Sequence, residues 1–176
     1  MACSITNGRE WQCKEQTGGI VAVYFANFGE LTGLTVTDGA IASGLDTAVG
    51  GGKATLYKFA LPKDTANLSD VLNVSTENGT VEAEQTLEIT LHKLQAADRN
   101  KIRLIATGRP HVIVEDRNGN NLLLGFQRGV DVTSATAQTG TAGTDLSGYT
   151  ISMVGKETDS APFVTDDLSN ATIVTS

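Results

Sequence analysis

Residues 80–92 read Thr-Val-Glu-Ala-Glu-Gln-Thr-Leu-Glu-Ile-Thr-Leu-His, and this stretch decides the fold. Small or apolar side chains alternate with acidic or hydroxyl side chains along it, with one lapse at Gln85. A two-residue period places the two kinds of side chain on opposite faces of a β-strand, whereas a helix would mix glutamates with leucines. At about 3.3 Å per residue the strand would reach roughly 40 Å, enough to cross a sheet or to project from it.

The segments around this strand are mainly further predicted strands. They lie at residues 20–26, 53–61, 111–116, 121–126, 130–135 and 149–155, with weaker candidates at 31–38 and 68–75. The run at 20–26 is continuously apolar, which is typical of a strand buried on both faces. The pairs Asn78-Gly79 and Asn118-Gly119 favour tight turns, and the second predicts a hairpin closed by a mirror-image turn.

One helix is predicted, over residues 95–107. Apolar side chains change there to an approximate helical spacing, Gly108 follows at the usual C-terminal position and Pro110 bars continuation. The predicted fold is therefore mainly β, an antiparallel β-barrel or sandwich with one flanking α-helix and long loops.

Size and composition favour a single domain over residues 1–176. The chain has a mass of 18.4 kDa, and its hydrophobic fraction of 40% includes few aromatic residues. Such a length supplies one hydrophobic core rather than two.

Two segments are expected to lie outside that core. Residues 39–52 are mainly Gly, Ala, Ser and Thr, and we expect a flexible loop that orders when subunits meet. The glycines proposed for this inter-subunit loop are Gly39, Gly44, Gly50, Gly51 and Gly52. Residues 157–176 are acidic and rich in Ser and Thr, and we expect an extended C-terminal tail.

The net charge of −7 argues against sequence-specific binding of nucleic acid. No stripe of Lys or Arg is present, and neutralisation of phosphates supplies most of the affinity in such complexes. The N-terminus does not resemble a signal peptide, and no apolar run is long enough for a transmembrane helix. We therefore expect a soluble protein made in a reducing cytoplasm, with Cys3 and Cys13 as reduced thiols whose redox state the sequence leaves open.

Searches for catalytic, metal and cofactor motifs fail. The sequence Gly50-Gly51-Gly52-Lys53 lacks the earlier glycine of a phosphate-binding loop and the following Ser or Thr. His111 and Glu115 stand about 13 Å apart on a strand, too far to share a metal ion. Glu82, Glu84 and Glu88 have the spacing of paired glycosidase acids, but no aromatic sugar platform accompanies them. No enzyme activity, metal or cofactor is predicted.

The order of elements from Val81 to Glu157 resembles the tail tube proteins of tailed bacteriophages, which share a fold with the tube proteins of bacterial secretion needles. The long strand ending Leu87-Glu88-Ile89-Thr90-Leu91, the helix 95–107, the hairpin 111–120 and the closing strand 148–155 carry this resemblance. It covers less than half of the chain, and the family has no sharp motif.

The resemblance implies a virion structural protein that self-assembles into stacked hexameric rings forming a tail tube, the channel for genome ejection into the host. Implied partners are other copies of this chain and tape-measure, sheath and tail-end proteins, with DNA passing without sequence-specific binding and no membrane involved. The implied location is the virion tail, and the host cytoplasm during assembly. Glu82, Glu84 and Glu88 would line the channel, where an acidic wall repels DNA.

Two alternatives remain open at this stage. The chain could be another virion part, such as a capsid-decorating or head-to-tail joining protein, which would form trimers or single rings. It could also be a sugar-binding or hydrolytic β-sandwich, which would show a ligand-dependent shift in melting temperature. The sequence does not say whether the tail is contractile, which host is infected, which face of strand 80–92 meets the channel or whether the free subunit is monomeric.

Overall fold

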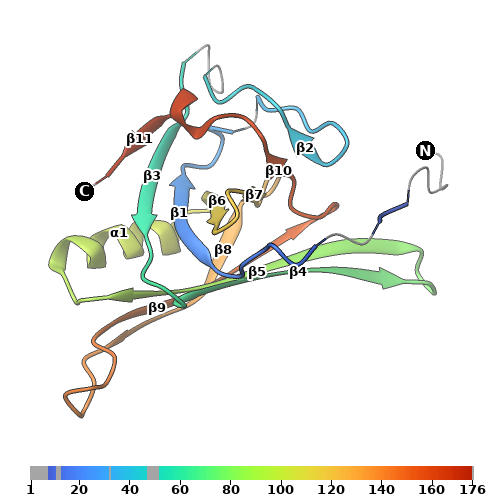
Figure 1. Cartoon of the computed structure of the whole chain (residues 1–176). Coiled ribbons are helices and arrows are strands. Elements are labelled where there is room, and N and C mark those ends of the chain that lie inside the picture. The colour runs from blue at the N-terminus through green and yellow to red at the C-terminus, as the bar shows by residue number, and fades with distance from the viewer. Residues whose placement is uncertain (1–7, 11–12, 32, 47–51, 176) are drawn as a thin grey trace.

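The computed structural model describes residues 8–10, 13–31, 33–46 and 52–175. Within them the chain folds into two β-sheets and one α-helix (Figure 1). The prediction of a mainly β protein with one flanking helix is confirmed. The sheets form a sandwich and do not close into a barrel within one chain.

The first sheet has seven strands. In spatial order they are β11 (Thr172–Val174), β3 (Thr55–Ala60), β1 (Ile20–Ala26), β6 (His111–Asp116), β7 (Asn121–Leu124), β10 (Phe163–Val164) and β2 (Ala40–Ile41). The pairs β11–β3 and β10–β2 are parallel, and the other pairs are antiparallel.

The second sheet has four antiparallel strands. Its order is β4 (Ala66–Ser75), β5 (Thr80–His92), β9 (Gly148–Glu157) and β8 (Val130–Gln138). Strand β5 has the bounds expected from its alternation. Strand β4 pairs with β5 over its whole length, so the weaker candidate at 68–75 is a full ten-residue strand. The described residues of the candidate at 31–38 form no strand, because the chain turns there and Thr37 makes an isolated bridge with Ala40.

Burial explains why the strands of the two sheets differ in sequence. The seven-stranded sheet is covered on both faces, so six of the seven residues of β1 are buried. One face packs against the second sheet and the helix, with Val23 opposing Leu87 and Ile151 in the same cluster. The other face is covered by loop side chains such as Leu31 and Leu45. The four-stranded sheet is buried on one face, which produces the alternation in β5.

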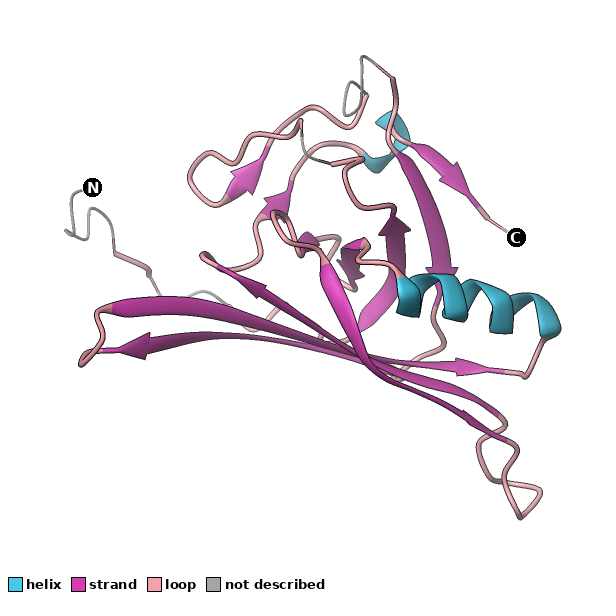
Figure 2. Ribbon diagram, turned by 180° about the vertical axis from the view of Figure 1, so that it is seen from behind, coloured by secondary structure: helices cyan, strands magenta, loops and turns pink. Residues whose placement is uncertain are grey.

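Helix α1 (Ala96–Thr107) follows β5 and lies beside the lower ends of β1 and β3 (Figures 1 and 2). Ile102 is buried against the core between the sheets, and Ile105 is partly buried there. The helix ends at Thr107, and the Gly108 amide donates to the Leu104 carbonyl, as expected from the sequence.

The hairpin between β6 and β7 forms as predicted, but its turn is not the mirror-image type. That turn requires positive φ at both central residues. Gly119 has a φ of 81°, whereas Asn118 does not have positive φ. The Asp116 side chain instead organises the loop, because it accepts hydrogen bonds from the Asn118 and Asn120 amides, each at 2.8 Å.

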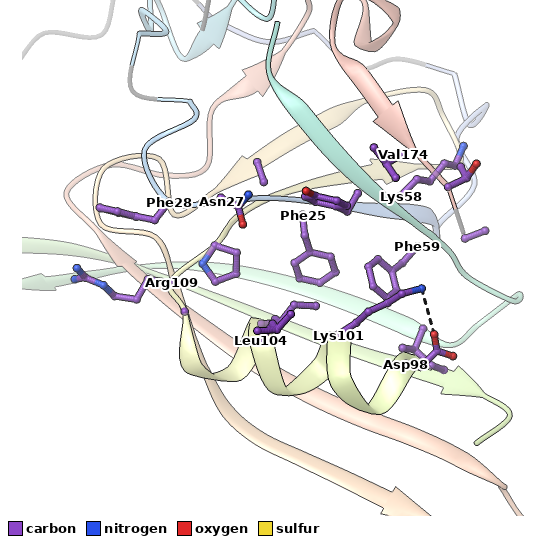
Figure 3. A pocket seen from close by; sticks show the side chains of 18 of the residues that line it. Phe25, Asn27, Phe28, Lys58, Phe59, Asp98, Lys101, Leu104, Arg109 and Val174 are labelled. Atoms are coloured by element: carbon purple, nitrogen blue, oxygen red, sulfur yellow. Dashed lines mark ion pairs between the residues drawn. The ribbon is translucent and has the colours of Figure 1, made fainter. Parts of the chain in front are cut away.

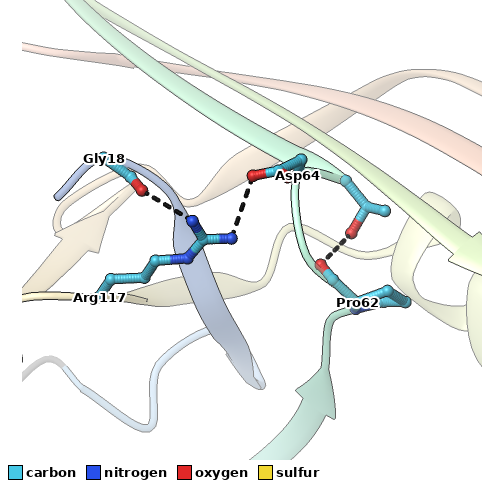
Figure 4. A network of polar contacts seen from close by, with 5 residues as sticks. Gly18, Pro62, Asp64 and Arg117 are labelled. Atoms are coloured by element: carbon cyan, nitrogen blue, oxygen red, sulfur yellow. Dashed lines mark hydrogen bonds and ion pairs between the residues drawn. The ribbon is translucent and has the colours of Figure 1, made fainter.

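Arg117 ties this hairpin to two other segments (Figure 4). Its guanidinium donates to the Gly18 carbonyl at 3.2 Å and forms an ion pair with Asp64 at 3.1 Å. Asp64 lies in the connection between β3 and β4, where the chain passes from one sheet to the other. The contact therefore links both sheets with the segment that precedes β1.

The segment 39–52 is not a free loop where the structure describes it. Residues 40–41 form β2, and both Ile41 and Leu45 are completely buried. The Leu45 amide donates to a carboxylate oxygen of Asp166 at 3.1 Å. Two apolar side chains among small residues are thus enough to anchor this segment. The average composition of the segment gave no sign of this anchoring.

The C-terminal tail is also packed against its own chain. Glu157 is the buried last residue of β9, and Val164 in β10 is buried beside β7 and β2. Strand β11 adds to the edge of β3. The expected extended tail after residue 157 is therefore largely part of the seven-stranded sheet, because its scattered apolar residues find partners far away in the sequence.

Candidate functional site

The candidate site is the open face of the four-stranded sheet together with its two edges. In the described part of the chain no helix or strand covers this face (Figures 1 and 2). The paired registers place the following polar side chains on it: Asn67, Ser69, Asn73, Ser75, Thr80, Glu82, Glu84, Thr86, Glu88, Thr90, His92, Asp131, Ser134, Thr136, Gln138, Thr150, Ser152 and Lys156. The four strands carry no aromatic side chain on this face, which leaves no platform for a sugar ring.

The structure brings Glu82, Glu84 and Glu88 together on this face, as the alternation of β5 predicted. The side chains of Glu82 and Glu84 are 43% and 39% exposed, and Glu88 is also exposed. The residues between them, such as Ala83 and Leu87, are completely buried in the opposite direction. The face is therefore exposed to solvent and acidic.

Lys156 is the residue of this face that sequence reasoning missed. Its Nζ lies 3.4 Å from Glu82 Oε2 and 3.9 Å from Glu84 Oε2. Because β9 is directly paired with β5, Lys156 stands opposite Glu84 across the ladder. Exposed ion pairs contribute little to stability, so Lys156 mainly reduces the negative charge at one end of the glutamate row. The alternation of β9 could have placed it, but only once its partner strand was known.

Gln85, the lapse in the alternation, is a buried structural residue. It is 1% exposed, and its side-chain oxygen accepts a hydrogen bond from the Gly125 amide at 3.0 Å. Its amide nitrogen lies 3.5 Å from the Asp159 carbonyl. The Gln85 side chain therefore supplies hydrogen-bond partners to two backbone groups, one of them just after the end of β7. Its role is structural.

The two edges of this sheet are long and unpaired within the described residues. Strand β4 forms one edge over ten residues and β8 forms the other over nine. Strand β4 contains no Pro, Lys or Arg, the residues with which proteins usually protect an edge. Strand β8 has a bulge between Val132 and Ser134 and is otherwise regular.

The hydrogen-bond pattern identifies the backbone groups that face outward. In β8, Ser134 and Thr136 stand opposite Ser152 and Thr150 of β9, and their exposed neighbours Ala135 and Ala137 alternate with them. Antiparallel strands alternate between residues bonded to the partner and residues bonded away from it. Val130 belongs to the outward set, because its amide donates to Pro110 and not to β9. The bulge between Val132 and Ser134 inserts one extra residue, so beyond it the outward set moves by one position, from even-numbered to odd-numbered residues. Ala135 and Ala137 therefore direct their amides to the free edge.

The other sequence-predicted residues lie apart from this face. Gly39 and Gly44 belong to the packed segment around β2, Gly52 is exposed before β3, and Gly50 and Gly51 fall outside the described residues. At Gly44, whose φ is 124°, an added Cβ would stand 2.8 Å from the Leu34 side chain. This glycine serves close packing within the chain, and the assignment of the five glycines to an inter-subunit loop stays a prediction.

His111 and Glu115 lie apart on β6 and have separate partners. The His111 ring is completely buried between Gly29 and Gly125, whereas Glu115 accepts a hydrogen bond from the Tyr24 hydroxyl at 2.7 Å. Among the described residues, no group of three or more His, Cys, Asp or Glu side chains has the geometry of a metal site.

No helix in the described part of the chain combines the length and apolar character that crossing a membrane requires. Comparisons of the sequence with protein-family models and with curated proteins found no match.

Proposed function

We propose that this protein is a virion structural protein whose copies assemble into stacked hexameric rings and so form a tail tube, the channel for genome ejection. The observation that carries the proposal is the four-stranded sheet, which has one open, acidic face and two long edges that no described strand pairs with. An exposed long edge is a template for pairing with another chain, and a closed ring of sheets leaves no edge.

The strand directions suit closure into a ring. Each strand of the β4-β5-β9-β8 sheet is antiparallel to its neighbour, so the two edge strands β4 and β8 run in opposite directions. A copy rotated about a common axis would therefore present its β4 antiparallel to the β8 of the preceding copy. The ladder would continue around the ring with the same pairing as inside each subunit.

The distribution of mass favours one face of the four-stranded sheet for the channel wall. The seven-stranded sheet and helix α1 both lie on the covered face of the four-stranded sheet (Figure 1). A ring has more room outside than inside, so these bulky elements belong on the outside and the open face belongs within. Glu82, Glu84 and Glu88 would then face the lumen, where they repel the phosphates of passing DNA.

The proposal is tested by blocking one edge without disturbing the subunit. The Ala137→Pro substitution removes an amide that faces away from β9, at an exposed position of β8. We expect this variant to remain folded and monomeric at concentrations where the unaltered protein assembles, as measured by sedimentation. The Ala137→Ser variant keeps the amide and should assemble normally.

Electron microscopy of the same samples gives the decisive outcomes. Hollow filaments from the unaltered protein and Ala137→Ser, but not from Ala137→Pro, support the proposal. Filaments formed equally well by Ala137→Pro would contradict pairing through this edge. Trimers or single rings that never stack would favour a capsid-decorating or head-to-tail joining protein.

A further inference from the structure

The end of the β4–β5 hairpin carries apolar side chains that no other described part of the chain covers. Strand β9 pairs with β5 only as far as Ala83, and beyond this point the hairpin extends past the body of the molecule (Figure 1). Leu72, Val74 and Val81 are 52%, 62% and 50% exposed. The register places them on the same side of the sheet as the buried Leu87. This side therefore continues the core face of the sheet, but here the apolar side chains are exposed.

An apolar groove lies at the opposite end of β5. It is a cavity of about 900 Å³ between helix α1 and strands β1 and β3, and Leu91 at the end of β5 belongs to its lining. Figure 3 shows Phe25, Phe59 and Leu104 directed toward this space. Leu104 is 63% exposed, whereas Ile102 and Ile105 on the neighbouring face of the helix pack into the core.

The groove and the hairpin end have opposite charge. Lys58, Lys101 and Arg109 line the groove, and Asp98 is its single carboxylate, already paired with Lys101 at 3.5 Å. The hairpin lies within residues 65–92, which contain no Lys or Arg. On the apolar side of its distal half the acidic side chain is Asp70, and Glu77 lies in the turn, whereas Glu82 and Glu84 lie on the opposite, open face. Such complementarity steers association and fixes its orientation.

We infer that the distal end of the β4–β5 hairpin of one copy docks into this groove of a second copy in the adjoining ring. The inference rests on the proposed function and names the contact that would stack the rings. The hairpin end and the groove lie at opposite ends of β5 and on the same side of its sheet. A second copy displaced along the strand direction therefore places its groove at the hairpin end of the first copy. Such a head-to-tail contact does not close on itself and propagates from ring to ring.

The test substitutes each side of the contact at exposed positions. Leu72→Asn/Val74→Asn alters the hairpin, and Val71→Asn is its control, because Val71 lies on the opposite face of the same strand. Leu104→Glu alters the groove, and Ala106→Glu is its control, because Ala106 is exposed on the helix but does not line the groove. Melting curves establish that each variant is folded, and Leu104→Gln replaces Leu104→Glu if that variant is not.

We expect both altered proteins to form rings, with a critical concentration for tubes raised at least about tenfold, whereas the controls match the unaltered protein. In a mixture of the two variants, rings of the groove variant still have intact hairpins, and rings of the hairpin variant still have intact grooves. The mixture should give paired rings that grow no further, seen by electron microscopy.

Normal tubes from either altered protein would overturn the docking while leaving ring formation intact. Loss of tubes in the groove variant alone would assign the groove to another segment and would likewise overturn it. If the unaltered protein forms neither rings nor tubes, the proposed function fails and the docking fails with it.

Discussion

At the scale of single residues, His111 shows how the fold fixes one protonation state. The ring is completely buried, its Nε2 accepts a hydrogen bond from the Gly29 amide at 3.1 Å, and its Nδ1 lies 2.6 Å from the Gly125 carbonyl. Nδ1 therefore carries the proton and the ring is neutral. Burial lowers the pKa of His111, although the hydrogen bond to Gly125 acts in the opposite direction.

This lowered pKa gives the first prediction. The unfolded chain binds a proton at His111 near pH 6.5 and the folded chain only at lower pH, so the free energy of unfolding should fall as pH drops below about 6.5. His111→Gln should cost about 1–3 kcal/mol at pH 7 because buried backbone groups lose their partners, and it should flatten this pH dependence.

The measurement is urea unfolding between pH 7 and pH 5. His92→Gln is the matched control, because His92 is exposed on the open sheet, and this variant should keep the slope of the unaltered protein. An unchanged slope in His111→Gln would show that another group causes the pH dependence.

Gln85 shows what residue patterns cannot reveal. The sequence marks it as the one break in the alternation of β5, but its hydrogen-bond partner Gly125 lies 40 residues away. Gly125 also accepts from His111, so two buried polar side chains converge on one glycine. A polar residue in an apolar row can belong to a functional site or can be a core residue whose polar atoms are hydrogen-bonded. Partners that are distant in the sequence decide between the two.

At the scale of elements, the β6–β7 hairpin depends on Asp116. Burial acts to raise the pKa of this carboxyl, but hydrogen bonds from Asn120 and Asn118 outweigh burial and hold the pKa below its ordinary value of 3.8. The same hydrogen bonds replace the mirror-image turn that the Asn-Gly pair suggested. The side chain therefore determines the turn as much as the glycine does.

We predict that Asp116→Ala lowers the free energy of unfolding by about 1–3 kcal/mol at pH 7, because four donors lose their acceptor. A carboxyl with a lowered pKa stabilises the fold above its unfolded pKa and loses this effect as pH falls through the folded pKa. The difference between the two proteins should therefore narrow below pH 3.8. A difference that stays constant down to pH 2 would contradict this role.

The elements differ in how far the sequence could predict them. Strand β5 and helix α1 were predictable because each has one buried side and a regular period. The strand β4 was only a weak candidate, because its distal half bears apolar residues on both faces. The segments around β2, β10 and β11 were misjudged, because a few apolar residues such as Ile41 and Val164 anchor them through contacts that are far apart in sequence.

At the scale of the whole molecule, the charge of the open face should control how an assembled tube treats DNA. We predict that tubes of Glu82→Lys/Glu84→Lys/Glu88→Lys retain DNA, because the lumen would become positive, whereas unaltered tubes exclude it. Retention should weaken steeply with salt, since phosphate contacts release counterions. In tail particles, the same substitutions should slow genome release.

Co-sedimentation of tubes with DNA over a range of salt concentrations measures this effect. The variant with Gln at the same three positions is the control, because it removes the negative charge without adding positive charge, and it should bind DNA far less than the lysine variant. Equal DNA binding by the lysine variant and the unaltered protein would place these side chains outside the lumen.

The most direct test of the central claim is a cryo-electron microscopy reconstruction of the concentrated, unaltered protein. We expect a hollow filament whose inner wall is a continuous barrel, with β4 of each subunit paired antiparallel to β8 of the next and Glu82, Glu84 and Glu88 facing the axis. A protein that stays monomeric at every concentration, or an assembly in which these edges remain unpaired and the acidic face points outward, would contradict the central claim.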